Sequence, residues 1–474
     1  MLGTGLGAYL PLLIYLASMA GCVASLFRPA IGIWILALIL PLQGGRMRLL
    51  DYPLGAHVLQ LLLLFVFIGV LLKGGSIWPP KPMRKIVIAL CALTYVSLWI
   101  GAALSRAVPF PFLTSLPNGD HTPFGYWITF MHLPLLFILV NSVVKDKRQM
   151  QFLLFAMMIS FLWVMKNFYG NVAGRETTNY VEGLRNSMGQ DFGGSNGRAA
   201  FASQCTLLLL AVFGNIRSLR VRLVVVFLLV AGVYSVLFSY SRGAWLGFAC
   251  GILYLGVTRM RWFLAVGLLI VPFAGALLPR AVIQRATMTY QEGELDTSSA
   301  DRIQIWEHAL KTSFADPILG VGFDCYHFYR AEDEDELLDT HNMYVKAYVE
   351  TGVVGLLCLI GFFFSALRLG HRLARKATDP FYQALGAGFA AYMVSVIVAN
   401  IFGDRWTYID LSGYTWILLA LVVQGTLWTE AAANAPVAAP ATEPAPAPAP
   451  QPEATVAGRI RVRMRGLASG KFRG

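Results

Sequence analysis

A few arginines and one histidine, gathered around a long polar segment, are the residues of this chain best suited to chemistry. The segment opens with Arg280, Arg285 and Arg302, and it runs through Thr340 to His341. A guanidinium stays charged and binds anionic oxygens bidentately. A neutral imidazole, with an unperturbed pKa of about 6.5, accepts a proton from a hydroxyl group at neutral pH. These residue types predict a site that holds an anionic, lipid-borne substrate and deprotonates a hydroxyl.

Two further arginines lie outside this segment, each next to an apolar run. Arg242 follows Ser241 and precedes Gly243. An arginine at a lipid boundary needs an anionic partner or must reach the headgroups. Arg198 begins another apolar run after the glycine-rich residues 189–194, where the amides of a helix start would also favour an anion. We expect Arg242 and Arg198 to bind phosphate oxygens; the alternative is an arginine that only snorkels to the surface.

The polar segment itself is expected to be partly helical. Residues 302–315 are amphipathic at helical period, and this helix would carry Arg302 and Trp306 until Pro317 stops it. A second helix is expected just after His341. Asp339 or Glu350 could orient the imidazole; the alternative is a loop histidine that only bonds the backbone.

Other chemistry is disfavoured by residue spacing. The acidic run at 332–336 is typical of a solvated loop, because consecutive carboxylates do not preorganise a metal site. Five of the six cysteines lie in apolar runs, and Cys325 stands alone in the polar segment, so neither a disulfide framework nor a zinc site can be built. We therefore expect no metal and no cofactor.

The elements that position these residues are expected to be membrane helices. Of 474 residues, 57% are hydrophobic and 14% are charged, whereas soluble domains carry about 25% charged residues. The fold class predicted is all-α, a polytopic transmembrane bundle of about 12–13 spans with one large external, partly helical loop. The expected spans are 8–27, 30–43, 56–73, 86–105, 124–143, 151–169, 198–214, 222–240, 244–257, 262–279, 350–367, 382–402 and 411–428.

Charge sets the expected orientation and the domain boundaries. Lys and Arg cluster in loops on one side, which is predicted to be cytoplasmic, so the polar segment faces out. The net charge of +12 then reflects topology and lipid headgroups, not nucleic-acid binding. The domains expected are an N-terminal bundle (1–279), a catalytic loop domain (280–349), C-terminal transmembrane helices (350–428) and a Pro/Ala-rich disordered tail with a basic end (429–474).

At these residues the chain resembles the O-antigen ligase / O-antigen polymerase superfamily of bacterial polytopic membrane proteins. The resemblance covers roughly residues 190–425. It is carried by Ser241-Arg242-Gly243, Arg302 with Trp306, Pro317-x-x-Gly320-x-Gly322, His341-Asn342 and Glu350-x-Gly352-x-x-Gly355. Two N-terminal segments, 28–32 and 166–170, are similar to the exosortase-associated O-glycosylation ligase branch, although Gly194-Ser195-Asn196 stands where that branch has an Asp-Asn-Asn-like motif.

The resemblance implies a metal-independent, inverting glycosyltransferase of the bacterial inner membrane, with its active site facing the periplasm. The donor would be a glycan linked to undecaprenyl pyrophosphate, and the acceptor lipid A-core or a protein hydroxyl. The implied catalytic residues are His341, Arg242 and Arg302. The implied pyrophosphate- or glycan-binding residues are Arg198, Arg285, Ser241, Asn342 and Trp306.

Three other functions remain open from the residues. A polymerase that adds the growing chain to the next lipid-linked unit would use the same arginines and base as a ligase. A transporter or flippase would require ionisable residues in mid-span and paired broken helices. The predicted spans are nearly free of charge, apart from edge residues such as Lys166, which disfavours transport. A scaffold of an envelope-assembly complex would leave the boundary arginines unexplained.

Overall fold

The computed structural model describes residues 6–104, 110–111, 122–173, 178–181, 192, 194–270, 274–288, 290–291, 294–295, 297–329 and 340–434. The acidic run at 332–336, Asp339 and the basic end of the tail lie outside the described residues. Residues 1–430 form one compact unit, which contains every element discussed below apart from the last residues of the final helix.

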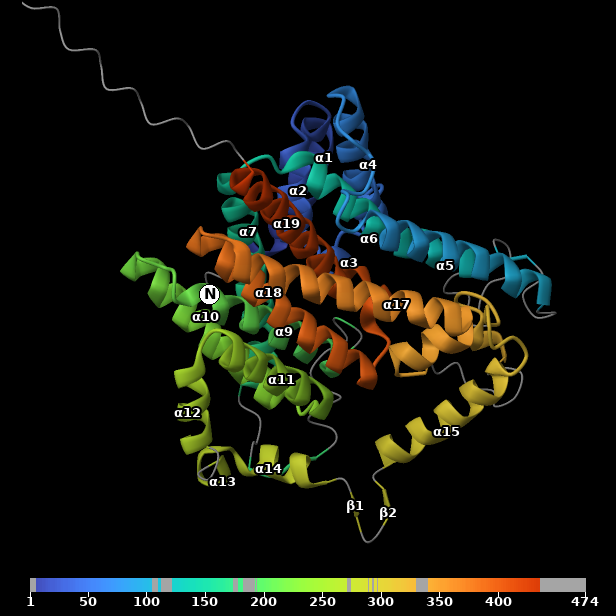
Figure 1. Ribbon diagram of the computed structural model, residues 1–474, viewed down its shortest axis with the longest axis vertical. Coiled ribbons are helices and arrows are strands. Elements are labelled where there is room, and N and C mark those ends of the chain that lie inside the picture. Colours follow the sequence, from blue (N-terminus) through green and yellow to red (C-terminus); the bar gives the residue numbers. More distant parts are fainter. Residues whose placement is uncertain are drawn as a thin grey trace, which may run out of the picture. The chain divides into compact units, whose positions relative to one another are not determined.

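The N-terminal half of the chain is helical throughout its described parts (Figure 1). Apolar runs with few helix breakers explain the long helices, and Pro123 stands at the favoured first position of its helix, after the capping Thr122. The elements are α1 (Leu6–Phe27), α2 (Pro29–Ile39), α3 (Gln43–Met47), η1 (Gly55–His57), α4 (Val58–Leu72), α5 (Arg84–Leu104), α6 (Pro123–Val143) and α7 (Lys147–Val172).

The C-terminal half is also helical, apart from one small hairpin of two antiparallel strands. Its elements are α9 (Ser195–Phe213), α10 (Leu219–Phe238), α11 (Arg242–Thr258), α12 (Arg261–Ile270), α13 (Ala274–Leu277), α14 (Arg280–Thr287), β1 (Tyr290–Gln291), β2 (Glu294–Leu295), α15 (Thr297–Ser313), α17 (Met343–Lys376), α18 (Pro380–Ala399), η4 (Asn400–Phe402), η5 (Arg405–Thr407) and α19 (Ile409–Ala433). The all-α prediction is confirmed, and α19 continues beyond its expected end at 428.

Among the described residues, eight helices are long and apolar enough to cross a membrane. The other predicted spans (8–27, 30–43, 198–214, 244–257 and 262–279) also overlap helices, and two of these, Pro11–Phe27 and Pro29–Ile39, are apolar but shorter over the residues searched. Helix α2, with 11 residues, is only about 17 Å long, which is less than a hydrocarbon core of about 30 Å. The protein is therefore a multi-pass membrane protein, with eight helices of membrane-crossing length among the residues that the structure describes.

Helix α9 shows why hydropathy overcounts lipid-facing spans. It carries Arg198, Ser203, Gln204 and Thr206, all of them buried. It packs against α10, α11 and α18, and in Figure 1 it lies at the centre of this group. Its polar side chains are tolerated because protein, not lipid, surrounds them.

Helix α17 is two helical stretches joined at Gly352, whose backbone (φ 64°, ψ −172°) is not helical. A break frees amides and carbonyls, and in lipid these must find protein partners. The turn at 317–322 supplies them, and the Ser97 hydroxyl donates a further bond to the Glu350 carbonyl (2.6 Å). The backbone bonds are Val321 N to Val349 O (2.9 Å), Gly322 N to Glu350 O (3.1 Å), Val353 N to Pro317 O (3.0 Å) and Val354 N to Ile318 O (3.3 Å).

These hydrogen bonds between the 317–322 turn and α17 explain the spacing of the glycines in Gly320-x-Gly322 and Gly352-x-x-Gly355. A Cβ on Gly352 would collide with the carbonyl of Ile318, and one on Gly320 would collide with the carbonyl of Glu350. Both glycines also have positive φ (64° and 79°), a conformation that other residues adopt at a cost. The structure thus places a helix break at Gly352, inside the predicted span 350–367.

We predict that Gly352→Ala destabilises the protein by at least about 2–3 kcal/mol, because the new methyl group meets backbone and φ stays positive. Thermal unfolding in detergent measures this. Gly361→Ala in the same helix is the matched control, since its Cβ meets only a side-chain atom of Ile86 at 3.5 Å. Equal melting temperatures for the two variants would contradict the proposed break.

Candidate functional site

The first residue of α11 is Arg242, and its guanidinium reaches the chain that follows α14. Its Nη1 donates to the carbonyl of Met288 (3.1 Å). Ser241 occupies the N-cap position but makes no side-chain capping bond, and it is 4% exposed. The half-buried arginine therefore stands at a helix N-terminus, where the helix dipole adds to its positive charge.

Arg285 lies on α14, close to the same turn. It is buried, and its guanidinium stacks over the ring of Tyr180, 5.0 Å from the centroid. Tyr180 in turn meets Tyr240 edge to face, with centroids 5.2 Å apart. Because Tyr240 directly precedes the Ser241–Arg242 pair, the structure brings Arg242 and Arg285 into one neighbourhood.

Arg198 lies in the first turn of α9 and is 1% exposed. The helix starts after Gly194, and the next glycine, Gly197, packs against the carbonyl of Phe192. Further along α9, the Ser203 hydroxyl is hydrogen-bonded to the Ser395 hydroxyl of α18 (2.9 Å). Arg198 thus lies inside the bundle, at the end where α11 and α17 also begin.

One short connection joins the start of α11 to the start of α17. The glycine after Arg242 packs so closely on Phe402 that a Cβ there would lie 2.7 Å from the Phe402 Cβ. The next residue, Gly403, accepts a hydrogen bond from the amide of Met343 (3.1 Å). Adjacent Cα atoms are about 3.8 Å apart, so the two helix starts meet at a single peptide.

His341 lies in a tight turn just before α17, and it is exposed. Its φ of 51° is unusual for a residue with a side chain. The turn is held by the Thr340 hydroxyl, which donates to the carbonyl of Asn342 (3.0 Å). The Asn342 side chain caps α17 by accepting from the amides of Tyr344 (3.0 Å) and Val345 (3.3 Å). The imidazole therefore projects from a fixed backbone.

Helix α15 packs against α17 and braces the same turn. The indole of Trp306 donates to the carbonyl of Thr340 (2.9 Å). Arg302, one turn earlier on the same face, is half-buried. The loop is further closed by His308, whose Nδ1 lies 3.0 Å from the Tyr326 hydroxyl. The expected helix at 302–315 is confirmed, and it starts earlier, at Thr297.

Sequence reasoning missed a buried charged cluster beneath this turn, centred on Lys346. Lys346 is buried, with 1% of its surface exposed. Its ammonium lies near three carboxylates: Asp324 (3.9 Å), Glu350 (3.9 Å) and Asp404 (4.0 Å). His327 lies 3.6 Å from Asp324. The four-residue spacing of Lys346 and Glu350 on one helix could have predicted that ion pair. The other two partners, Asp324 and Asp404, are distant from Lys346 in the sequence.

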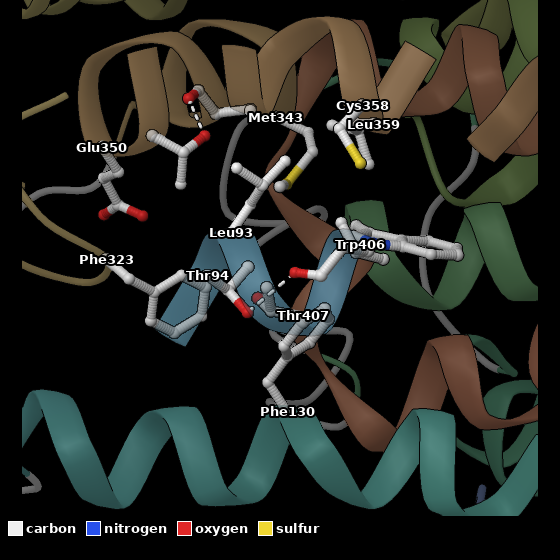
Figure 2. A pocket seen from close by; sticks show the side chains of 14 residues that line it. Leu93, Thr94, Phe130, Phe323, Met343, Glu350, Cys358, Leu359, Trp406 and Thr407 are labelled. Atoms are coloured by element: carbon white, nitrogen blue, oxygen red, sulfur yellow. Dashed lines mark hydrogen bonds between the residues drawn. The ribbon is translucent and has the colours of Figure 1, made fainter. Parts of the chain in front are cut away.

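A small cavity lies beside Glu350, among residues of α5, α6 and α17 (Figure 2). Its volume of about 30 Å³ suits about one water molecule. Three different helices line the cavity, through Glu350, Thr94 and Phe130. The cavity is therefore part of the packing that supports the turn, and it is not a substrate site. Nearby, burial and the carboxylates of Glu350 and Asp324 raise the pKa of the Cys325 thiol well above its usual range.

The cap at Asn342 yields a prediction that separates a structural role from a binding role. Asn342→Ala should lower stability by about 1 kcal/mol, because two amides lose their acceptor. Asn342→Asp keeps an oxygen at the cap and should retain wild-type stability in detergent unfolding. If both variants unfold alike, the cap does not stabilise α17.

Comparison with known proteins gives one family. Residues 227–360 match the family model described as O-antigen ligase, while no curated protein matches the chain. The matched part runs from within α10 into the second stretch of α17, and it includes Arg242, Arg285, Arg302 and His341. Such a family implies glycosyl transfer of a ligase or polymerase type. Residues 227–360 of this multi-pass membrane protein are therefore similar to the O-antigen ligase family.

Proposed function

We propose that the protein is a glycan ligase that transfers an undecaprenyl-pyrophosphate-linked glycan to a hydroxyl of an acceptor on the periplasmic face of the inner membrane. The observation that carries the proposal is the meeting of two helix starts at Phe402–Gly403. One start bears Arg242 and the other follows His341, which supports a single site with a cationic and a basic group.

In the proposed reaction, Arg242 and Arg285 bind the pyrophosphate oxygens and neutralise the charge that grows on them. The acceptor oxygen attacks the anomeric carbon as the bond from that carbon to the pyrophosphate oxygen breaks. His341 takes the hydroxyl proton, and undecaprenyl pyrophosphate leaves. Attack from the opposite face inverts the anomeric centre. Arg302 and Trp306 flank the Thr340–His341 turn, where they would meet the glycan.

The arrangement also supports the expectation that no metal is needed. A guanidinium that binds the leaving group performs the charge neutralisation that a divalent cation performs elsewhere. A polymerase would use the same residues, and the acceptor alone would differ. The products formed in cells therefore decide between ligase and polymerase.

We predict that His341→Asn lowers the transfer rate by about 10²–10⁴-fold, because the general base is lost. Asparagine is chosen because it tolerates positive φ, so the turn stays in place. The readout is the glycan profile of cells whose only copy carries the variant, with membrane levels checked. Long lipid-linked glycan with a bare acceptor indicates a ligase; acceptors with a single repeat unit indicate a polymerase.

The matched control for this experiment is His57→Asn, at an exposed histidine of η1. It should leave the glycan profile unchanged. A normal profile for His341→Asn at normal protein level would overturn the catalytic role of His341.

We also predict a graded loss at Arg242. Arg242→Lys keeps the charge but loses the bidentate donors, so kcat should fall by about tenfold; Arg242→Gln should cost about 10²–10³-fold. In vitro transfer from the lipid-linked donor measures both. Arg220→Gln, at an exposed arginine at the start of α10, is the control and should match wild type. Equal rates for Arg242→Gln and Arg220→Gln would exclude Arg242 from the reaction.

A further inference from the structure

Helices α7 and α10 border an apolar groove that the proposed reaction does not use. Its volume is about 620 Å³, within the range of about 300–1,000 Å³ typical of small-molecule sites. The two helices are among the eight that are long and apolar enough to cross a membrane. The lining residues are Ile159, Leu162, Trp163, Met165, Lys166, Tyr169, Phe227, Val230, Ala231 and Tyr234.

The lining is arranged as two facing stripes. On each helix the residues recur three or four positions apart, which puts them on one face. Several of these side chains are strongly exposed, including Phe227 (60%) and Val230 (64%). In a membrane helix such side chains face lipid, so the groove opens toward the hydrocarbon. A flexible apolar chain is the occupant that this surface fits.

One charged residue, Lys166, lines this apolar groove. Its ammonium lies 4.7 Å from the centre of the Trp163 ring. Neither α7 nor α10 contains an acidic residue, and no ion pair is formed by Lys166 within the described part of the chain. A lysine near the end of a membrane span, beside an apolar groove, is placed to meet an anionic lipid headgroup. Since neither of the two helices supplies a carboxylate, charge complementarity calls for an anionic ligand.

The groove leads toward the candidate site. Lys166 precedes the end of α7 at Val172 by six residues, or about 9 Å along the helix. The next turn of α7 packs, through Phe168, in the same cluster as Tyr180 and Tyr240. Tyr180 is the ring over which Arg285 stacks, as described above.

We propose that the α7–α10 groove binds the isoprenoid chain of the lipid-linked donor, and that Lys166 binds a phosphate oxygen of that lipid. Tyr169 and Tyr234, the aromatic residues with hydroxyl groups in the lining, stand beside it as hydrogen-bond donors. This inference rests on the proposed function, because it assigns the lipid part of the same donor. Lys166 is a binding residue here; it makes no contact with the reacting carbon.

The test is equilibrium binding of undecaprenyl pyrophosphate, without sugar, to the full-length protein in nanodiscs. Lys166→Gln should weaken binding by about tenfold, and Lys166→Arg should restore it, because a charge-assisted bond is lost and regained. Ala231→Trp should weaken binding at least as much by filling the groove. Val233→Trp is the matched control, since Val233 is exposed on α10 but does not line the groove.

Competition and transfer assays separate the outcomes. If phosphatidylglycerol displaces the probe with equal affinity, the groove is a general lipid site and the inference fails. If Lys166→Gln and Ala231→Trp bind like wild type while wild-type protein transfers glycan, the inference alone fails. If both variants lose binding but wild-type protein transfers no glycan, the groove assignment stands and the proposed function fails.

Discussion

The break in α17 at Gly352 is the constraint on which the rest of the site depends. A membrane helix that stops and restarts leaves backbone amides and carbonyls that lipid cannot satisfy. The 317–322 turn satisfies them by backbone bonds in both directions, so a loop far away in sequence is fixed inside the bundle. That turn leads directly to Asp324, and the first stretch of α17 leads back to His341. One backbone irregularity therefore locates both the Thr340–His341 turn and its support.

The buried charges around Lys346 extend the same support. Three carboxylates around one ammonium are tolerable because each charge has an opposite neighbour, whereas removal of the lysine would leave uncompensated buried charge. The members come from the 317–329 loop, from α17 and from the segment before η5. Hence the cluster ties the 317–329 loop to the two pieces of chain that carry His341 and Gly403.

Local patterns in the sequence were sufficient to predict much of this molecule. Hydropathy located every long helix, and the 3.6-residue period with Pro317 located α15. Two features could not be predicted from the sequence, for physical reasons. Helix α9 looks like a lipid-facing span because burial in protein and burial in lipid select similar residues. The partners of Lys346 are set by tertiary packing between residues such as Asp324 and Asp404, which no local period reports. The roles of the site residues remain predictions.

The two helix starts at the site differ in what their amides can still bind. At α17, the amides of Met343, Tyr344 and Val345 are occupied, by Gly403 and by the Asn342 cap. At α11, Ser241 provides no side-chain cap. Helix N-termini attract anions through such amides. Under the proposed function, the charged pyrophosphate would therefore bind at the start of α11, and the neutral acceptor hydroxyl would meet the start of α17.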